Sequence, residues 1–297
     1  MPNPFALIKK IGFACALHKM KRRIFINDKD IISRIACNGA YDYLQKYKYA
    51  LDFPIEQSSS ESPNPYPDKI WTMWLQGVEN APELIKKCIA SNVAQHGNDV
   101  IVLDSTNVSQ YIEIPDFITQ KWKAGIIPNA HYSDVLRILL LAKYGGTWID
   151  STIRLFAPVP AYIRQADIFV FKCIPMAHVL AANNFIAAQT NNAIVLKMKN
   201  LLLEFWKYEN KLASYSIFHL FFTMTVNTEK ELWQSIPYFD AVNNTILQME
   251  LFDKFNPARM EQIKQISSIQ KLSWKFPKEK FELEGTFYDE LIRKNKL

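Results

Sequence analysis

The chain has 297 residues, of which 49% are apolar and 22% are charged, and only eight are glycine. This length predicts one large domain or two small ones, with a sizeable buried core. The composition is typical of a globular protein and excludes both wholesale disorder and Gly-rich low-complexity classes. No stretch approaches the ~18 consecutive apolar residues of a membrane-spanning helix, so we do not expect a transmembrane protein.

The positive charge is concentrated at the N-terminal end. Residues 1–30 contain seven Lys or Arg and two Asp, a net charge of +5, whereas the rest of the chain holds 28 basic and 27 acidic residues. A nucleic-acid binder needs a basic face on its folded body, so no nucleic-acid partner is expected. The basic segment fits an anionic membrane surface, and the alternative is a solvated basic helix packed on the domain.

Cysteine usage and the N-terminus predict a cytoplasmic protein. The four cysteines, at positions 15, 37, 88 and 173, form no CxxC and no close pair, which indicates reduced core thiols. The apolar run at 11–17 spans seven residues, leads into a basic cluster and lacks a small-residue cleavage site, so it is not read as a secretion signal. Peripheral attachment to the inner face of the cell membrane through residues 1–30 stays open.

Residues 57–67 separate two parts of the chain. This segment is rich in serine and has prolines at positions 63, 65 and 67, which suit neither a helix nor a sheet interior and indicate a linker. Residues 1–56 are expected to form a basic, helical N-terminal segment with a helix near 31–49. Residues 68–297 are expected to form the main domain.

Strands and helices alternate in the first half of that domain, which predicts an α/β fold with a mostly parallel sheet and flanking helices. Helical additions are expected at both ends of the chain. The expected elements are a strand at 69–75 ended by Gly77, a helix from Pro82 to about Val93, a strand at 100–103, a helix at 133–144 with Ser133 as N-cap and Asp134 in its first turn, strands at 147–153 and 167–172, and helices from 191 to about 212 and from 215 to 226.

Ligands of open α/β sheets bind at the carboxyl ends of the strands. The residues that follow the expected strands are therefore candidates: Trp74, Leu75, Gln76, Gly77, Asp104, Asp150, Ser151, Thr152 and Lys172. The chain has no GxGxxG after its first strand, no GxxxxGK[ST] and no GxSxG. Rossmann dehydrogenases, P-loop NTPases and serine α/β-hydrolases are therefore disfavoured.

One constellation of polar residues stands out. Asp134 and Arg137 are three residues apart, hence on one face of the expected helix. The glycine pair at 145–146 lets the chain turn sharply from this helix into a strand that ends at Asp150. Asp150 is therefore expected to return close to the other two side chains. Two carboxylates and a guanidinium can hold sugar hydroxyls, a ribose and a metal-bound diphosphate.

Several motifs resemble those of the capsular polysaccharide synthesis proteins, relatives of glycosyltransferase family 32, and more distantly those of the clostridial glucosylating toxins. The motifs are WLQG at 74–77, NAPEL at 80–84, SDVLR at 133–137 and YGGTWID at 144–150, with further likeness at 184–188, 218–220 and 271–275. The resemblance covers roughly residues 68–292, and the first 56 residues lie outside it.

This resemblance implies a GT-A fold and a retaining transfer from a nucleotide-sugar, a UDP-sugar in the first instance, to a glycan or lipid-linked glycan of a bacterial surface polysaccharide. Asp134, Arg137 and Asp150 are then the catalytic candidates, and Asp134 and Arg137 bind the donor sugar and ribose. Trp74 would stack on the nucleotide base. The other donor-binding candidates are Gln76, Gly77, Lys271, Ser273 and Trp274, of which Ser273 and Trp274 match the region that contacts the donor phosphates.

The chain departs from the family pattern at one position. Asp150 matches the first carboxylate of the DxD motif, which binds a divalent metal, but the second carboxylate is replaced by Thr152. Mn²⁺ or Mg²⁺ prefers charged oxygen ligands, so a metal cofactor is expected from the family while strong metal dependence is in doubt. Cations such as Arg137, Lys271 or Lys275 offer the alternative stabilisation of a departing diphosphate. His219 is a further candidate metal ligand, with a buried structural histidine as its alternative.

Other assignments stay open. Trp71 and Trp148 are assigned to packing, and His131 is near the expected pocket without a role. Asn183 and Asn184 either cap a turn or meet the acceptor, and Asp104 or Asp116 would be the base of an inverting enzyme. Two other functions are kept as alternatives: a catalytically inactive nucleotide-sugar-binding or scaffold subunit, and an adaptor acting through its basic N-terminal segment.

Overall fold

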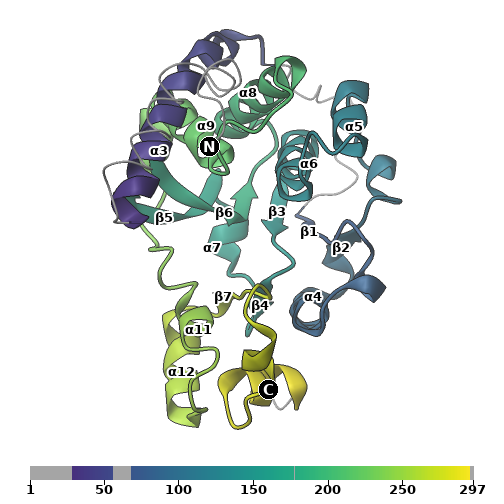
Figure 1. The fold of residues 1–297 in the computed structure, drawn as a ribbon, viewed down its shortest axis with the longest axis vertical. Coiled ribbons are helices and arrows are strands. Elements are labelled where there is room, and N and C mark those ends of the chain that lie inside the picture. The colour runs from purple at the N-terminus through teal and green to yellow at the C-terminus, as the bar shows by residue number, and fades with distance from the viewer. Residues whose placement is uncertain (1–28, 56–67, 177, 295–297) are drawn as a thin grey trace, which may run out of the picture.

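The computed structural model describes residues 29–55, 68–176 and 178–294. Its centre is a five-stranded sheet with the strand order β2-β1-β3-β6-β5 (Figure 1). The strands are β1 (Ile70–Met73), β2 (Val100–Leu103), β3 (Gly146–Ile149), β5 (Ile168–Met176) and β6 (Val179–Ala188). β1 is parallel to β2 and to β3, while β6 is antiparallel to both of its neighbours. Four strands therefore run one way and β6 runs the other, which confirms an α/β fold with a mostly parallel sheet.

Helices cover this sheet, and a smaller sheet of β4 (Ile153–Leu155) and β7 (Ile269–Lys271) lies below it in Figure 1. The α-helices are α3 (Lys29–Leu44), α4 (Glu83–His96), α5 (Asp116–Lys123), α6 (Asn129–Tyr144), α7 (Ala161–Arg164), α8 (Ala193–Tyr208), α9 (Ile217–Val226), α10 (Lys230–Ser235), α11 (Ile246–Met249) and α12 (Pro257–Ile266). Short 3₁₀ segments are η1 (Gln45–Asp52), η2 (Val78–Asn80), η3 (Gly97–Asp99), η4 (Val108–Gln110) and η5 (Lys278–Glu282), and a π-helical turn is η6 (Asp289–Arg293).

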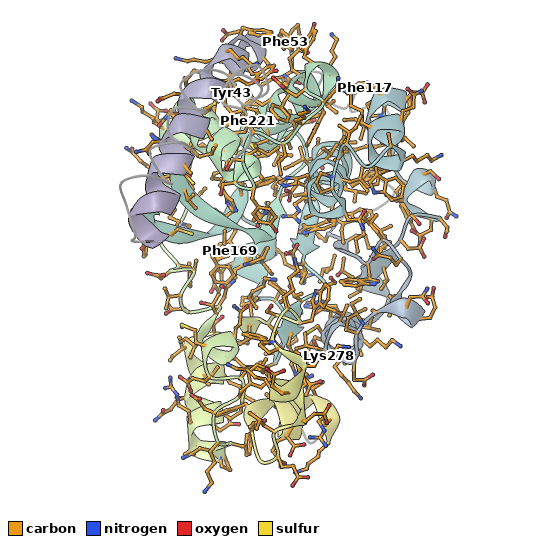
Figure 2. All side chains as sticks on the ribbon, in the orientation of Figure 1. Tyr43, Phe53, Phe117, Phe169, Phe221 and Lys278 are labelled. Atoms are coloured by element: carbon orange, nitrogen blue, oxygen red, sulfur yellow. The ribbon has the colours of Figure 1, made fainter. Side chains whose placement is uncertain are left out.

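The two faces of the main sheet are buried in different cores. Successive side chains of a strand point to opposite faces, so Trp71 of β1 joins a core with α6, α8 and α9, whereas Ile70 joins a second core on the other face. Figure 2 shows Phe221 of the first core among the helices and Phe169 of the second lower, at the sheet. Both faces of the sheet are therefore largely covered, and a ligand site is expected at the strand ends.

The N-terminal helix shares the core of the main domain. The predicted helix near 31–49 is confirmed as α3 continuing into η1, and Ala40 and Leu44 are buried with residues of α8 and α9. The Glu209 carboxylate at the end of α8 accepts hydrogen bonds from Tyr43 and Tyr47 (2.6 and 2.7 Å). Residues 1–28 and the predicted linker at 57–67 lie outside the described residues. Across the described ranges, no helix has both the length and the apolar character needed to cross a bilayer.

The predicted start of the helix at 133–144 is wrong. The helix predicted from Ser133 begins four residues earlier, at Asn129 after Pro128, so Ser133 is not an N-cap and Asp134 lies in the second turn. The early start is explained by burial, because His131 and Tyr132 of the added turn are packed in the interior. Asp134 is therefore held by its side-chain partners and not by the helix dipole, whose effect falls off within the first turn.

The strand predicted at 147–153 is in fact two strands. β3 ends at Ile149, and a tight turn closed by the Ile153 amide donating to the Asp150 carbonyl (2.8 Å) leads into β4 of the small sheet. The strand predicted at 167–172 extends to Met176, so Lys172 lies within β5 and not after it. Lys172 is buried and donates hydrogen bonds to the carbonyls of Trp233 and Ile236, which gives it a structural role.

The described cysteines agree with the expectation of reduced thiols. Cys37 and Cys88 are buried and Cys173 is half-buried, and each is a free thiol. Burial raises the pKa of the Cys88 thiol to about 12, so it is protonated and unreactive at neutral pH.

Gly146 is required where α6 turns into β3. Its φ of +88° lies in the left-handed region, and a Cβ there would overlap the carbonyl oxygen of Lys69 on the neighbouring chain segment. We predict that Gly146→Ala lowers the free energy of unfolding by about 3 kcal/mol, from strain plus overpacking. Gly125→Ala is the matched control, because Gly125 also has positive φ (+71°) but open space around it, and it should cost about 1 kcal/mol. Equal losses in urea titrations would contradict this account.

Candidate active site

A cavity of about 530 Å³ opens at the carboxyl ends of β1 and β3. Of the residues to which the family resemblance gives a catalytic, donor-binding or metal-binding role, all but Gly77 line it: Trp74, Gln76, Asp134, Arg137, Asp150, Thr152, His219, Lys271, Ser273 and Trp274. Gly77 does not line it, and instead makes the turn after β1 with a φ of +82°. Residues far apart in the sequence, from β1 to the segment after β7, thus meet at one polar opening.

Arg137 is the centre of the cavity floor. Its guanidinium contacts Asp134 (NH1 to Oδ1, 3.3 Å) on the same face of α6 and donates a hydrogen bond to Asp150 (NH2 to Oδ1, 3.0 Å) after β3. It also donates to the backbone carbonyl of Asn183 on β6. The rings of Trp148 and Phe218 lie 4.8 and 5.6 Å from its central carbon. The predicted cluster of two carboxylates and a guanidinium therefore forms as the spacing indicated.

Asp134 is buried on the same floor, with 6% of its surface exposed. Besides Arg137, its Oδ1 accepts a hydrogen bond from Asn183 Nδ2 (3.1 Å), and its Oδ2 lies 3.6 Å from His131 Nδ1. Burial raises the pKa of Asp134 above its ordinary value, although the neighbouring Arg137 opposes this. Burial also lowers the pKa of His131 to about 4, so this histidine is neutral at pH 7 and does not neutralise Asp134.

Asp150 presents one carboxylate oxygen to its protein partners and the other towards the cavity. Oδ1 accepts hydrogen bonds from Arg137 and from Trp148 Nε1 (2.9 Å), while Oδ2 lies 4.0 Å from Lys271 Nζ. The Asp150 amide donates to the Asn184 carbonyl (2.9 Å), which continues the ladder between β3 and β6. Trp148, assigned to packing alone, therefore also orients the candidate catalytic carboxylate.

Trp74, predicted to stack on the nucleotide base, and Trp274, predicted to contact the donor phosphates, lie next to each other in the cavity. Trp74 and Trp274 meet edge to face with ring centroids 5.9 Å apart, and 39% of Trp274 is exposed. Ser273 lies next to this pair, and its hydroxyl accepts a hydrogen bond from the Lys275 amide (3.1 Å). Gln76 is exposed at the same end. A planar base can stack on such a pair of rings.

His219 and Tyr215 line another part of the cavity. The His219 ring contacts the Ala181 carbonyl (Nδ1 to O, 2.9 Å), and burial lowers its pKa below the ordinary value. This contact fits the alternative of a hydrogen-bonded structural histidine, and metal binding by His219 stays a prediction. Tyr215 is 70% exposed and packs edge to face against His131.

The side chains around Asp150 do not form a good site for a divalent metal ion. No group of three or more His, Cys, Asp or Glu side chains suited to a metal occurs among the described residues. Thr152 supplies a neutral hydroxyl, and the Lys271 ammonium donates a hydrogen bond to it. The free oxygen of Asp150 thus faces an ammonium group. Mg²⁺ and Mn²⁺ select sites of oxygen ligands without a competing cation.

Some site residues could not be assigned from the sequence. Asn183 and Asn184 lie on β6 beside the carboxyl end of β3, an arrangement that follows from antiparallel pairing and not from a local motif. Asp104 and Asp116 do not line the cavity. Asp104 instead caps its own loop through Thr106 and Asn107, and the Thr106 hydroxyl holds its pKa below the ordinary value.

Comparison with known proteins identifies the family of this chain. The model of the capsular polysaccharide synthesis protein family matches residues 20–291, and the chain belongs to this family. The match begins well before residue 68, so it includes α3 and η1, which the motifs alone had left outside the resemblance.

Two curated relatives match parts of the chain. The O-glycosyltransferase braB of Annulohypoxylon truncatum is 29% identical over 157 residues, which are 46% of this chain and 37% of the relative. The glycosyltransferase afumC of Aspergillus fumigatus is 24% identical over 211 residues, 64% of this chain and 48% of the relative. The matches thus span less than half the length of these relatives. Among solved structures, the PaToxG glycosyltransferase is 17% identical with a TM-score of 0.40, covering 89% of this chain and 98% of its own.

The buried, neutral state of His131 predicts a pH-dependent stability. Its folded pKa of about 4 lies below the unfolded value of 6.5, so between these pH values the unfolded state binds a proton that the folded state does not. The free energy of unfolding should therefore fall by about 3 kcal/mol from this group as pH drops from 6.5 to 4. Urea titrations across this range should show a shallower pH dependence for His131→Phe. An unchanged dependence would contradict the burial of a neutral ring.

Proposed function

We propose that this protein is a glycosyltransferase that moves a sugar from a nucleotide-sugar, a UDP-sugar in the first instance, to a growing capsular polysaccharide or related glycan of a bacterial surface. The observation that carries the proposal is the Asp134–Arg137–Asp150 cluster on the floor of an open polar cavity. Family membership and the glycosyltransferase names of both curated relatives support it. The α/β architecture with its site at the strand ends is the one expected of a GT-A fold.

The cavity is suited to an extended donor with three chemically different parts. The Trp74 and Trp274 rings offer a stacking surface for the base. Lys271 and Lys275 line the same cavity and offer positive charge to a diphosphate. Asp134 and Asp150 accept hydrogen bonds, as the hydroxyls of a sugar and a ribose require. The donor sugar is accordingly expected beside the Arg137 cluster.

The proposed transfer retains the configuration of the anomeric carbon. The bond from this carbon to the diphosphate oxygen breaks, its electron pair leaves with the diphosphate, and a bond forms to an acceptor hydroxyl oxygen whose proton passes to the leaving group. Among the described residues that line the cavity, Asp134 and Asp150 are the only acids, and both contact Arg137. Neither is placed as a free base for an inverting attack, which supports retention.

Asp150 is the residue on which the proposed activity depends most directly. We predict that Asp150→Asn lowers donor hydrolysis at least ~100-fold, because a preorganised charge facing the reacting group is lost. The asparagine keeps an oxygen that accepts from Trp148, so the fold should persist in circular dichroism and thermal melting. Asp116→Asn is the matched control, an exposed acid outside the cavity, and should retain full activity.

The assay is release of sugar from a panel of UDP- and GDP-sugars, because the donor sugar depends on a few pocket contacts. Equal activity of Asp150→Asn and the wild-type protein on the best donor would mean that the site is misassigned.

A second candidate function rests on Thr152. If the missing carboxylate ended catalysis, the protein would be a nucleotide-sugar-binding or scaffold subunit. Calorimetry would then detect binding of UDP or GDP, while no donor of the panel would turn over with or without Mn²⁺. Turnover of any donor that depends on Asp150 would exclude this alternative.

Membrane attachment through residues 1–30 is a separate part of the proposal. It rests on the net charge of +5 in this segment, of which residues 1–28 lie outside the described structure. We predict that the full chain co-sediments with vesicles containing anionic lipid and is released by high salt, because surface electrostatics are screened over ~8 Å at physiological ionic strength. Removing residues 1–28 should abolish co-sedimentation. Equal binding to neutral vesicles, or binding insensitive to salt, would contradict an electrostatic attachment.

A further inference from the structure

In space, the side chain of Lys271 lies between the side chains of Asp150 and Thr152. Lys271 Nζ donates a hydrogen bond to Thr152 Oγ1 and lies 4.0 Å from Asp150 Oδ2. The ammonium group thus sits between the two positions of the DxD-like motif, where two carboxylates would face a divalent ion. The substitution of the second carboxylate by Thr152 is therefore matched by a cation from a distant part of the chain.

The backbone fixes this lysine opposite the motif. β7 pairs with β4 in antiparallel fashion, with Lys271 directly across from Ile153. The next amide, of Leu272, donates to the Thr152 carbonyl (2.8 Å). Leu272 itself is fully buried. The Cα of Lys271 is therefore held opposite Ile153 by sheet hydrogen bonds, and the side chain starts beside the motif that its ammonium group contacts.

The carboxylates of Asp150 and Asp134 offer few oxygen atoms to a metal ion, because protein groups already bind them. Asp150 Oδ1 already accepts from Arg137 and Trp148, and Asp134 is bound to Arg137 and Asn183. The free oxygen, Asp150 Oδ2, faces the ammonium. A divalent ion entering beside Asp150 would meet two positive side chains, Lys271 and Arg137, and would find the free Asp150 oxygen already beside the ammonium group.

We propose that the Lys271 ammonium replaces the divalent metal as the counter-charge to the donor's diphosphate, so that nucleotide binding and transfer do not require a metal ion. This inference rests on the proposed glycosyltransferase function. As the bond between the anomeric carbon and the diphosphate breaks, negative charge grows on the diphosphate, and a fixed cation stabilises it without a proton leaving Lys271.

The ammonium form of Lys271 depends on the negative charges around it. Burial lowers the pKa of Lys271 and so disfavours the ammonium form, and the nearby Asp150 carboxylate opposes that effect. A bound diphosphate adds further negative charge and favours the ammonium form. Lys275 lines the same cavity and supplies a second positive charge near the diphosphate.

The first test needs no variant. UDP and GDP binding are measured by calorimetry on the full wild-type chain in excess EDTA and then in Mn²⁺, together with donor hydrolysis. The inference expects the same affinity and the same rate in both conditions. Binding or turnover that is lost in EDTA and restored by Mn²⁺ would overturn it while leaving the proposed function intact. Failure to bind UDP or GDP, with no turnover of any donor, would overturn the proposed function as well.

The second test assigns the effect to Lys271. Lys271→Met should weaken binding of the nucleoside diphosphate about 10-fold or more, because a hydrogen bond to a charged group is lost, and should leave binding of the parent nucleoside unchanged. Lys278→Met is the matched control, an exposed lysine of η5 that Figure 2 labels, and it does not line the cavity. An unchanged diphosphate affinity in Lys271→Met would refute the assignment.

A charge exchange gives the sharpest outcome. The double variant Lys271→Ala/Thr152→Asp restores a second carboxylate and removes the ammonium. It should bind the nucleoside diphosphate only when Mn²⁺ is present, whereas the wild-type chain binds it without metal. Equal metal dependence of both proteins would overturn the inference, and a melting curve for each variant shows that it is folded.

Discussion

The buried guanidinium of Arg137 constrains the whole site. With only 4% of its surface exposed, it is held between the carboxylates of Asp134 and Asp150, which come from a helix and a strand end. Removing one partner of such a buried pair typically costs ~3–5 kcal/mol, a large part of the ~5–15 kcal/mol that stabilises a domain. These ion pairs therefore stabilise the packing of α6 against the end of β3. The cavity lies between these two elements and depends on their fixed positions.

The same constraint explains the topology around the site. Gly145 and Gly146 both adopt positive φ, which lets α6 reverse directly into β3 and brings Asp150 back to the helix. On the other side of β3 the sheet changes from parallel to antiparallel pairing at β6. That change places Asn183 in the middle of β6, beside the carboxyl end of β3, where its backbone and side chain bind Arg137 and Asp134. The site lies where the direction of the strands changes.

The sequence predicts what depends on local pattern. Short apolar runs in the sequence locate the strands of the parallel part. The spacing of Asp134, Arg137 and Asp150 locates the charged cluster. The sequence did not predict contacts that depend on distant pairing, such as Lys271 with Thr152, which are 119 residues apart. The start of α6 was misplaced because Ser133 resembles an N-cap, whereas burial of His131 and Tyr132 extends the helix. The break after Ile149 was missed because β4 pairs with β7, a strand near the other end of the chain.

Charge is distributed unevenly between the two ends of the cavity. Two acids and three basic side chains line it. His131 and His219 also line it and are neutral at pH 7, because burial lowers the pKa of both, so an anionic ligand finds one formal positive charge in excess. That excess lies beside Ser273 and Trp274, because Lys271 and Lys275 flank them in the chain. The Arg137 charge, in contrast, is already matched by its two carboxylates. For the proposed nucleotide-sugar donor, electrostatics therefore favour the diphosphate next to the tryptophan pair and the uncharged sugar beside the Arg137 cluster. A single orientation of this proposed donor satisfies both ends of the cavity.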